Sequence, residues 1–558
     1  MCQPDLRQPL FFGCVVCPVG ARHKVFKKKA DDFLSNKKDK TTKRSHPVLS
    51  TTFVFLAAVI LFAALWGFSQ VGTLELNQIV YHMNAPINGT DKTLVFNYLL
   101  TGLLPAVAVT AAYYVIFFLI LGKKHRFKKK NKFTNFVKKI TPVSKIQTIS
   151  LVLSIVLFAV SFSYTTIRLD LPEFIKNSTT ESTFIQDNYV DPRETTITFP
   201  KQKRNLVCIF MESTEATYFS EENGGFFGSM PELEQLALEN VNFSNTETLG
   251  GAKQYTSTDW TIAGLVSQTS GIPLKSSIKR NQYGKKEKTF LPGDYTLGEI
   301  LESQGYRNSF LCGSDIAFAS RDKYFSQHGN YSIYDLNSAL EDGVIEQKND
   351  FWGFEDHLLF ELAKQQLAET AADTSTPFNF TMLTVDTHYP YGWHCEVCPE
   401  VFEPEDDSEQ AQKYANYKNA MACSSRHVND FVEWIKQQPF YENTTIVICG
   451  DHLSMSKQIS EETDGYQRTV ANVFINAAAT PANMKNRDFG TFDMFPTVVA
   501  SLGCKIEGER LGLGTNLFSD KPTIAETIGY EALNKEISKK SIFYNERFLY
   551  GNLAYGKQ

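Results

Sequence analysis

Residues 446–452 read IVICGDH: an apolar run typical of a buried β-strand ends in the pair Asp451 and His452. Residues 205–211 (NLVCIFM) are followed in the same way by Glu212. In an open α/β sheet, ligands bind outside the carboxyl ends of the strands. We therefore expect Glu212, Asp451 and His452 to meet around one divalent ion. Adjacent carboxylate and imidazole ligands suit Zn or Mn.

A Thr-rich turn lies between these two strands in the sequence, at residues 255–261 (YTSTDWT). It supplies a hydroxyl that a bound ion could activate, which is the chemistry of a metal-dependent enzyme with a covalent hydroxyl nucleophile. Thr256, Ser257 and Thr258 could equally cap the helix expected after them. A helix N-terminus also presents backbone N–H groups to a phosphate, so the two interpretations are compatible.

Each candidate also has an ordinary structural explanation when taken alone. Glu212 is as readily a capping carboxylate as a metal ligand, and an Asp–His pair can simply hold a turn. His388 follows a predicted strand in residues 384–391 (TVDTHYPY), and Arg321 could clamp a phosphate through its planar guanidinium. A lone His is usually structural and a lone Arg usually lies at the surface, so only the combination indicates a site.

Three segments are apolar enough to span a bilayer: residues 48–71, 96–121 and 149–167. Spanning takes about 20 mostly apolar residues, and none of the three carries a charge. Buried helices of a soluble core would show a polar stripe at helical period, and these do not. We therefore predict three transmembrane helices.

Basic residues gather at 22–44 and 123–145, beside the apolar segments, although the net charge is only -5. Such blocks mark the cytoplasmic side of membrane helices, so we do not expect a nucleic-acid partner. The N-terminus is then inside and everything after residue 167 is outside.

The sequence predicts four parts: a basic cytoplasmic segment (1–47), a membrane domain (48–167), a linker (168–204) and an exported catalytic domain (205–558). In the last part, short apolar strands alternate with helical patterns, which indicates α/β architecture with a mostly parallel sheet covered by helices. The expected strands are 206–211, 308–312, 378–385, 445–449 and 472–475. The expected helices include 231–239, 296–304, 354–366, 409–437 and 491–502.

The cysteines divide by compartment under this topology. Cys2, Cys14 and Cys17 would face the reducing cytoplasm, and we interpret their spacing as incidental. Cys395, Cys398 and Cys423 lie on the oxidising side, where one disulfide among them is expected with its connectivity open.

Taken together, these motifs resemble the alkaline-phosphatase/sulfatase superfamily, and within it the membrane-anchored phosphoglycerol and phosphoethanolamine transferases. The W-T-I-A-G-x-x-S-Q run is most similar to the branch that decorates periplasmic glucans with phosphoglycerol. No C/S-x-P-x-R motif follows Glu212, which argues against sulfate ester hydrolysis. The resemblance rests on residues 205–213, 258–273, 312–322, 384–391, 447–453 and 492–503.

The resemblance implies a role for each candidate. Glu212, Asp451 and His452 are expected as ligands of one divalent metal ion (Zn, Mn or Mg). Thr258 is expected as nucleophile and fourth ligand, with Thr256 and Ser257 close enough for a register error. The remaining two candidates, Arg321 and His388, would hold the phosphate, headgroup or acceptor.

The implied reaction moves a phosphorylated headgroup from a membrane phospholipid to a hydroxyl of an exported glycan, lipopolysaccharide or polymer, through a phospho-threonine. The protein would be a monomer in the bacterial inner membrane with its catalytic domain on the periplasmic side. Two alternatives stay open: a phosphodiesterase or phosphatase of the same fold, and a non-catalytic membrane assembly protein.

Overall fold

The computed structural model describes residues 48–72, 74–86, 92–116, 143–276, 283, 288–348 and 351–556. The chain divides into two compact units, one of residues 1–62 and 103–164 and the other of residues 63–102 and 165–558. The segment between the first two apolar helices therefore belongs to the same unit as the C-terminal domain. The predicted basic segment 1–47, most of the basic block 123–145, and Cys2, Cys14 and Cys17 lie outside the described residues.

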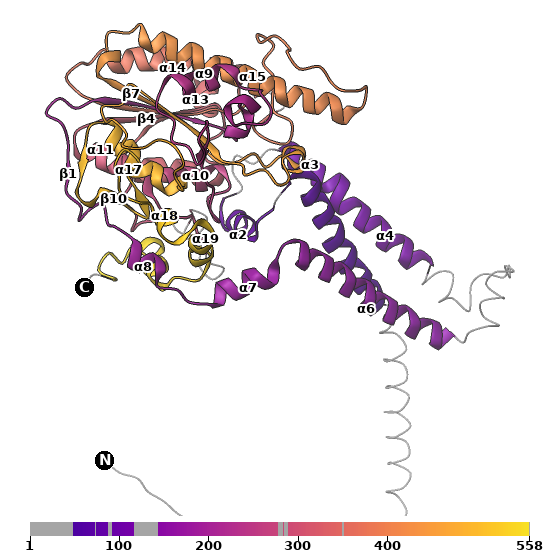
Figure 1. Cartoon of the computed structure of the whole chain (residues 1–558). Helices are drawn as coiled ribbons and strands as arrows, with labels where there is room; N and C mark the ends of the chain where they lie inside the picture. The colour runs from indigo at the N-terminus through magenta and orange to yellow at the C-terminus, as the bar shows by residue number, and fades with distance from the viewer. Residues whose placement is uncertain are drawn as a thin grey trace, which may run out of the picture. The chain divides into compact units, whose positions relative to one another are not determined.

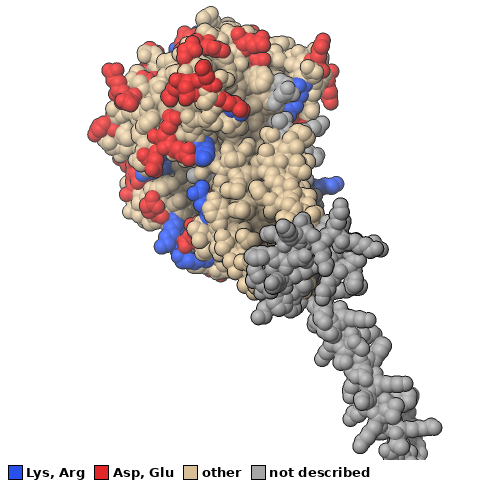
Figure 2. Space-filling view, turned by 90° about the vertical axis from the view of Figure 1, so that its right-hand side faces the viewer, with Lys and Arg blue, Asp and Glu red and all other residues tan. Residues whose placement is uncertain are grey.

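Three helices are long and apolar enough to cross a membrane: Val48–Gln70, Leu94–Tyr114 and Gln147–Arg168. The second includes most of α3 (Lys92–Asn97), a π-helical turn (Tyr98–Leu103) and α4 (Leu104–Tyr114), and the third lies in α6 (Val143–Arg168). These helices confirm the three predicted apolar segments, except for residues 117–121 of the second, which lie outside the described residues. In the space-filling view, acidic side chains are frequent over one part of the described surface, whereas another part is almost free of charged side chains (Figure 2).

The second unit is built on a seven-stranded sheet in the order β3-β8-β7-β2-β6-β4-β5. Strands β7, β2, β6, β4 and β5 are parallel, while β8 runs antiparallel to β7 and β3 antiparallel to β8. The mostly parallel sheet and the five predicted strands are confirmed. The strands are β2 (Asn205–Met211), β3 (Gly251–Ala252), β4 (Arg307–Cys312), β5 (Ser332–Tyr334), β6 (Phe378–Leu383), β7 (Thr444–Gly450) and β8 (Val470–Ile475).

Helices cover both faces of the sheet (Figure 1). On one face lie α9 (Pro231–Glu239), α14 (Asp356–Ala371) and α15 (Glu409–Lys436). On the other lie α10 (Thr261–Ser270), α11 (Leu297–Ser303), α12 (Arg321–Gln327) and α17 (Thr491–Ser501). Successive side chains of a strand point to opposite faces. Leu206 and Phe210 of β2 accordingly pack in one core cluster, and Val207 and Ile209 in the other.

Shorter elements complete the unit. The predicted linker 168–204 contains α7 (Leu171–Thr179), α8 (Phe184–Asn188) and β1 (Ile197–Thr198), which pairs with β9 (Lys505–Ile506). The remaining short strands are β10 (Arg510–Leu511) and β11 (Gly514–Thr515). The remaining short helices are α2 (Leu76–Asn84), α13 (Leu336–Glu341), α16 (Lys457–Glu462), α18 (Ile524–Ile528), α19 (Tyr530–Ser538) and α20 (Ile542–Tyr544).

Candidate metal centre and active site

The ends of two neighbouring strands bring three predicted ligands together. Met211, the last residue of β2, pairs with Gly450, the last residue of β7, so the next residue of each strand emerges at the same edge of the sheet. Glu212, Asp451 and His452 are all buried there. His452 Nε2 lies 3.4 Å from Glu212 Oε1 and 3.4 Å from Asp451 Oδ2. The sheet register therefore places this set, as the sequence predicts.

The donor set suits a divalent ion. One ligand atom from each of Glu212, Asp451 and His452 lies within 4.8 Å of the others. Within the described residues, Asp451 Oδ2 is buried and makes no hydrogen bond, so a buried lone pair faces the cluster. Two hard carboxylate oxygens and one imidazole nitrogen fit Zn or Mn. These residues could hold one divalent metal ion.

The charges of the cluster point to the same conclusion. Burial raises the pKa of Asp451, and Glu212 raises it further, to about 8. Burial lowers the pKa of His452, but Asp451 and Glu212 outweigh it and raise the pKa to about 10. Burial also opposes ionisation of Glu212, yet His388 and His452 bring its pKa down to about 2. The clustered carboxylates thus require nearby positive charge, which a divalent cation would supply.

A threonine hydroxyl lies beside this cluster, and it belongs to Thr261. Thr261 is the first residue of α10, and its Oγ1 lies 3.2 Å from Glu212 Oε2 and 3.4 Å from His452 Nε2. Two contacts hold α10 against the end of β7. Gln268 Nε2 donates to the carbonyl of Asp451 (3.1 Å), and a Cβ at Gly264 would collide with that same carbonyl.

The structure does not bring the Thr258 hydroxyl, expected from the sequence as nucleophile and fourth ligand, into the cluster. Its buried hydroxyl donates to the Tyr255 carbonyl at 2.8 Å and accepts from the Tyr255 backbone N–H at 3.0 Å. Thr258 therefore closes the turn that precedes α10. Thr256 is engaged elsewhere, with Glu75 and Asn77. The hydroxyl that faces the ligands lies three residues further on, inside the W-T-I-A-G run itself.

Arg321 and His388 lie around the same cavity as Thr261 and His452. His388 Nδ1 hydrogen-bonds the Tyr389 carbonyl at 2.8 Å, and burial lowers the pKa of His388. Arg321 is buried, and its guanidinium donates to Ser314 Oγ and to nearby backbone carbonyls. Both predicted residues therefore lie close to the cluster. Several of the N–H groups of Arg321 are already hydrogen-bonded to its own loop.

One wall of the cavity comes from α2, which the sequence did not predict as part of the site. Gln78 and His82 of α2 line the cavity, and the His82 ring stacks on Phe318. Tyr81 is buried and donates to the Ala319 carbonyl at 2.5 Å. The helix lies between the first and second apolar helices in the sequence, so this short connecting segment lines the cavity directly.

Two further carboxyl groups, those of Glu75 and Asp259, lie at the turn that precedes α10. Glu75 Oε2 accepts from Thr256 Oγ1 at 3.1 Å, and burial raises the pKa of Glu75. Burial, together with Glu75, raises the pKa of Asp259 well above its ordinary value. These two groups therefore favour their neutral forms where the α2 segment meets the turn.

A family model described as Sulfatase matches residues 204–504, just over half of the chain. The chain belongs to the sulfatase family. The match begins at β2 and ends after α17, so it includes the strand ends that carry Glu212, Asp451 and His452.

Curated relatives of this family member carry the name phosphoglycerol transferase I. One from Xanthomonas campestris pv. campestris (strain B100) is 32% identical over 58% of this chain and 44% of its own length. One from Escherichia coli (strain 55989 / EAEC) is 35% identical over 47% of this chain and 33% of its own length. The chain thus spans less than half the length of these relatives.

Solved structures of similar fold include two bacterial proteins. One is the lipoteichoic acid synthase LtaP from Listeria monocytogenes (18% identity, 60% of this chain and 80% of that chain, TM-score 0.44). The other is the lipooligosaccharide phosphoethanolamine transferase A from Neisseria meningitidis (13% identity, 82% of this chain and 84% of that chain, TM-score 0.48).

Proposed function

We propose that this protein transfers a phosphorylated headgroup, phosphoglycerol or phosphoethanolamine, from a membrane phospholipid to a hydroxyl of an exported glycan or lipid. The observation that carries the proposal is the position of Thr261 Oγ1 against Glu212 and His452. A hydroxyl beside a carboxylate and imidazole set is the arrangement that nucleophilic catalysis at phosphorus requires. The names of the curated relatives support headgroup transfer.

Thr261 is the proposed nucleophile, in place of Thr258. A divalent ion held by Glu212, Asp451 and His452 would lower the pKa of a neighbouring hydroxyl and neutralise phosphoryl charge. Thr261 Oγ1 forms a bond to phosphorus, the bond from phosphorus to the diacylglycerol oxygen breaks, and that oxygen takes a proton.

The second half of the reaction restores the threonine. A hydroxyl of the acceptor attacks phosphorus, the bond to Thr261 Oγ1 breaks, and the threonine oxygen is reprotonated. We propose His388 as the base for the acceptor proton, because burial favours its neutral form and its Nδ1 is already held by the Tyr389 carbonyl. The backbone N–H groups of the first turn of α10 would face the phosphate.

The three apolar helices fit this reaction. We propose that they keep the site at the outer surface of the bacterial inner membrane, where a donor lipid reaches it without leaving the bilayer. The cavity wall that α2 contributes supports this position, because α2 lies between the first two apolar helices in the sequence.

The experiment follows both products of full-length protein in vesicles that contain phosphatidylglycerol and phosphatidylethanolamine, with Mn²⁺ or Zn²⁺. The proposal predicts diacylglycerol release that accelerates when a glucan acceptor is added, with the headgroup found on the acceptor. Equal release without acceptor, with free headgroup phosphate as product, would instead assign a phosphodiesterase. No diacylglycerol under either condition, while metal is bound, would contradict the proposal.

A further inference from the structure

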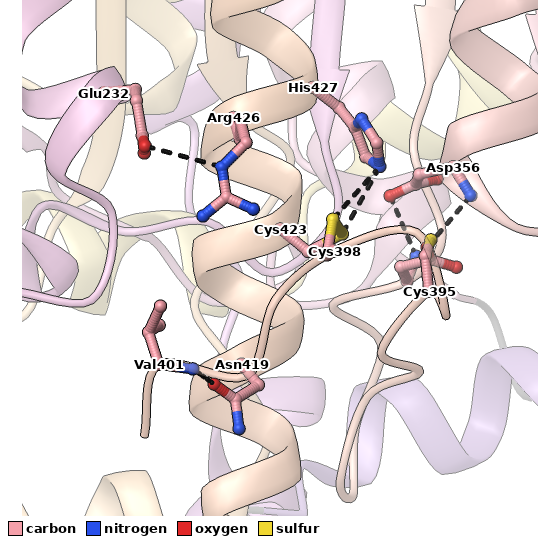
Figure 3. Close-up of a disulfide and its surroundings, with 10 residues drawn as sticks. Glu232, Asp356, Cys395, Cys398, Val401, Asn419, Cys423, Arg426 and His427 are labelled. Atoms are coloured by element: carbon pink, nitrogen blue, oxygen red, sulfur yellow. Dashed lines mark hydrogen bonds and ion pairs between the residues drawn. A yellow bond between two sulfur atoms is a disulfide. The ribbon is translucent and has the colours of Figure 1, made fainter.

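A second group of ligand-type side chains surrounds a disulfide (Figure 3). Cys395 and Cys398 lie in the segment between β6 and α15, and Cys423 and His427 lie one turn apart on α15. The three cysteines form a small buried cluster of their own. Cys398 and Cys423 are joined by a disulfide, and Cys395 is a free thiol. The predicted single disulfide is thereby located, with Cys395 as the unpaired third cysteine.

The spacing of these four side chains is that of a zinc ligand set. Along the chain they read C-x₂-C and C-x₃-H, and Cys₃His is a common composition of structural zinc sites. A sequence with C-x₂-C alone is a weak signal. The fold adds the other two ligands by bringing α15 beside the loop.

The distances support the same conclusion. His427 Nε2 lies 3.3 Å from Cys423 Sγ and 3.6 Å from Cys398 Sγ. Cys395 Sγ lies within 4.8 Å of Cys423 Sγ and of a His427 ring nitrogen. With Zn–S of about 2.3 Å and Zn–N of about 2.0 Å, a tetrahedral site separates sulfur from nitrogen by about 3.6 Å and sulfur from sulfur by about 3.8 Å. The covalent bond between Cys398 and Cys423 holds these two sulfurs closer together than zinc ligands.

We infer that Cys395, Cys398, Cys423 and His427 bind one Zn²⁺ when the disulfide is reduced. An external dithiol supplies two electrons and two protons, the S–S bond breaks, and the dithiol becomes its own disulfide. Zinc then binds three thiolates and one neutral imidazole, and three thiol protons pass to solvent. The disulfide and the zinc site are thus two alternative cross-links within the same cluster of side chains.

The cluster is accessible to both reactants. Cys398 and His427 line an open cavity together with His357, Glu361, Lys364 and Arg426. Cys398 is therefore the sulfur that a reductant reaches first, and the same opening admits a hydrated metal ion. Cys395 and Cys423 lie deeper, at 0% and 1% exposure.

Either cross-link, the disulfide or the zinc ion, attaches the loop that contains His388 to helix α15. Cys395 Sγ donates to Asp386 Oδ2 at 2.8 Å, and Asp386 lies two residues before His388. The backbone N–H of Trp393 donates to the Asp386 carbonyl at 2.7 Å. Zinc binding would release Asp386 from Cys395 while keeping the loop attached to the helix.

The test uses full-length protein in detergent and Co²⁺ as a spectroscopic substitute for Zn²⁺. Thiolate ligands give Co²⁺ an intense charge-transfer absorption, which the oxygen and nitrogen ligands of the strand-end cluster cannot give. The inference predicts one extra Co²⁺ equivalent with this absorption after reduction, and none in the oxidised protein. The Cys395→Ser and His427→Ala variants should lose or strongly weaken it, while Cys504→Ser, at a separate buried thiol, should keep it.

A second measurement needs no variant. In reduced wild-type protein, Zn²⁺ should protect three cysteines from alkylation, and a chelator should expose them. Reduced wild type without the absorption, or full absorption in Cys395→Ser, would overturn the inference. Metal bound to the oxidised protein reports on the strand-end cluster alone. Loss of metal binding at the strand-end cluster can therefore be distinguished from loss of metal binding at the cysteine cluster.

Discussion

Two clusters of ligand-type side chains in the second compact unit are held in different ways. Glu212, Asp451 and His452 stand at the ends of two hydrogen-bonded strands, and their positions follow from the register of β2 against β7. Cys395, Cys398 and Cys423 join a loop to a helix, and a covalent bond holds two of them together. The comparison teaches that a parallel sheet can position a site through backbone geometry, whereas a loop needs a cross-link.

The largest effect should come from the hydroxyl that completes the strand-end cluster. Thr261→Ala should lower transfer activity by at least about 10³-fold, because it removes the nucleophile. Metal content should change much less, since the carboxylates and His452 remain. Thr258→Ala is the matched control: it removes a turn hydroxyl that faces Tyr255, and should retain most activity. Steady-state transfer rates of both variants decide which threonine is the nucleophile. A larger loss of rate in Thr258→Ala than in Thr261→Ala would assign the nucleophile to Thr258 instead.

The support behind the strand-end cluster should be costly to break. Glu215, at 0% exposure, pairs with Arg468 at 2.6 Å and also accepts from the Ser454 backbone N–H. Glu215→Ala leaves the partly buried Arg468 guanidinium without its carboxylate partner, which should cost about 3 kcal/mol of unfolding free energy.

Thermal unfolding of Glu215→Ala beside Glu461→Ala measures this cost. Glu461 pairs with Lys457 at the surface, where such pairs contribute at most about 1 kcal/mol. Similar small losses in both variants would show that the Glu215 pair does not brace the strand ends.

The cross-link of the second cluster should matter for stability more than for chemistry. Cys398 and Cys423 are 25 residues apart, and closing a loop of that length contributes about 3 kcal/mol in the chain-entropy account. Without a reductant, Cys398→Ser should therefore unfold at a lower denaturant concentration than the wild type, while metal binding by the strand-end cluster is unchanged. Cys504→Ser serves as the control for loss of a buried thiol. Loss of the active-site metal in Cys398→Ser alone would make the two clusters one structural unit.

The smallest effect should come from the segment that walls the cavity of the first cluster. Tyr81→Phe removes one buried hydrogen bond to the Ala319 carbonyl, which should cost about 1–2 kcal/mol. If α2 closes the cavity, the KM for donor lipid should rise more than kcat falls. An unchanged KM together with the stability loss would limit α2 to a packing role.

The strand ends could be predicted from sequence because their signal is local. Apolar runs predicted β2 and β7, and the residues after them are the cluster. Thr261 was missed because its position depends on how α10 docks, and Gly264 and Gln268 set that contact only in three dimensions.

Other features carry no local signal. Hydrophobic periodicity does not encode strand direction, so the antiparallel β8 could not be predicted. The role of α2 could not be predicted because α2 lies almost two hundred residues before the turn that it contacts. Disulfide connectivity likewise depends on which of Cys395 and Cys398 the fold brings to Cys423.

The central claim is that Thr261 carries the headgroup phosphate. Intact mass of the full-length protein, after incubation with divalent metal and either phosphatidylglycerol or phosphatidylethanolamine, tests it most directly. The account predicts a mass increase of one phosphorylated headgroup in wild type and in Thr258→Ala, and none in Thr261→Ala. An adduct that persists in Thr261→Ala, or one that disappears only in Thr258→Ala, would contradict it.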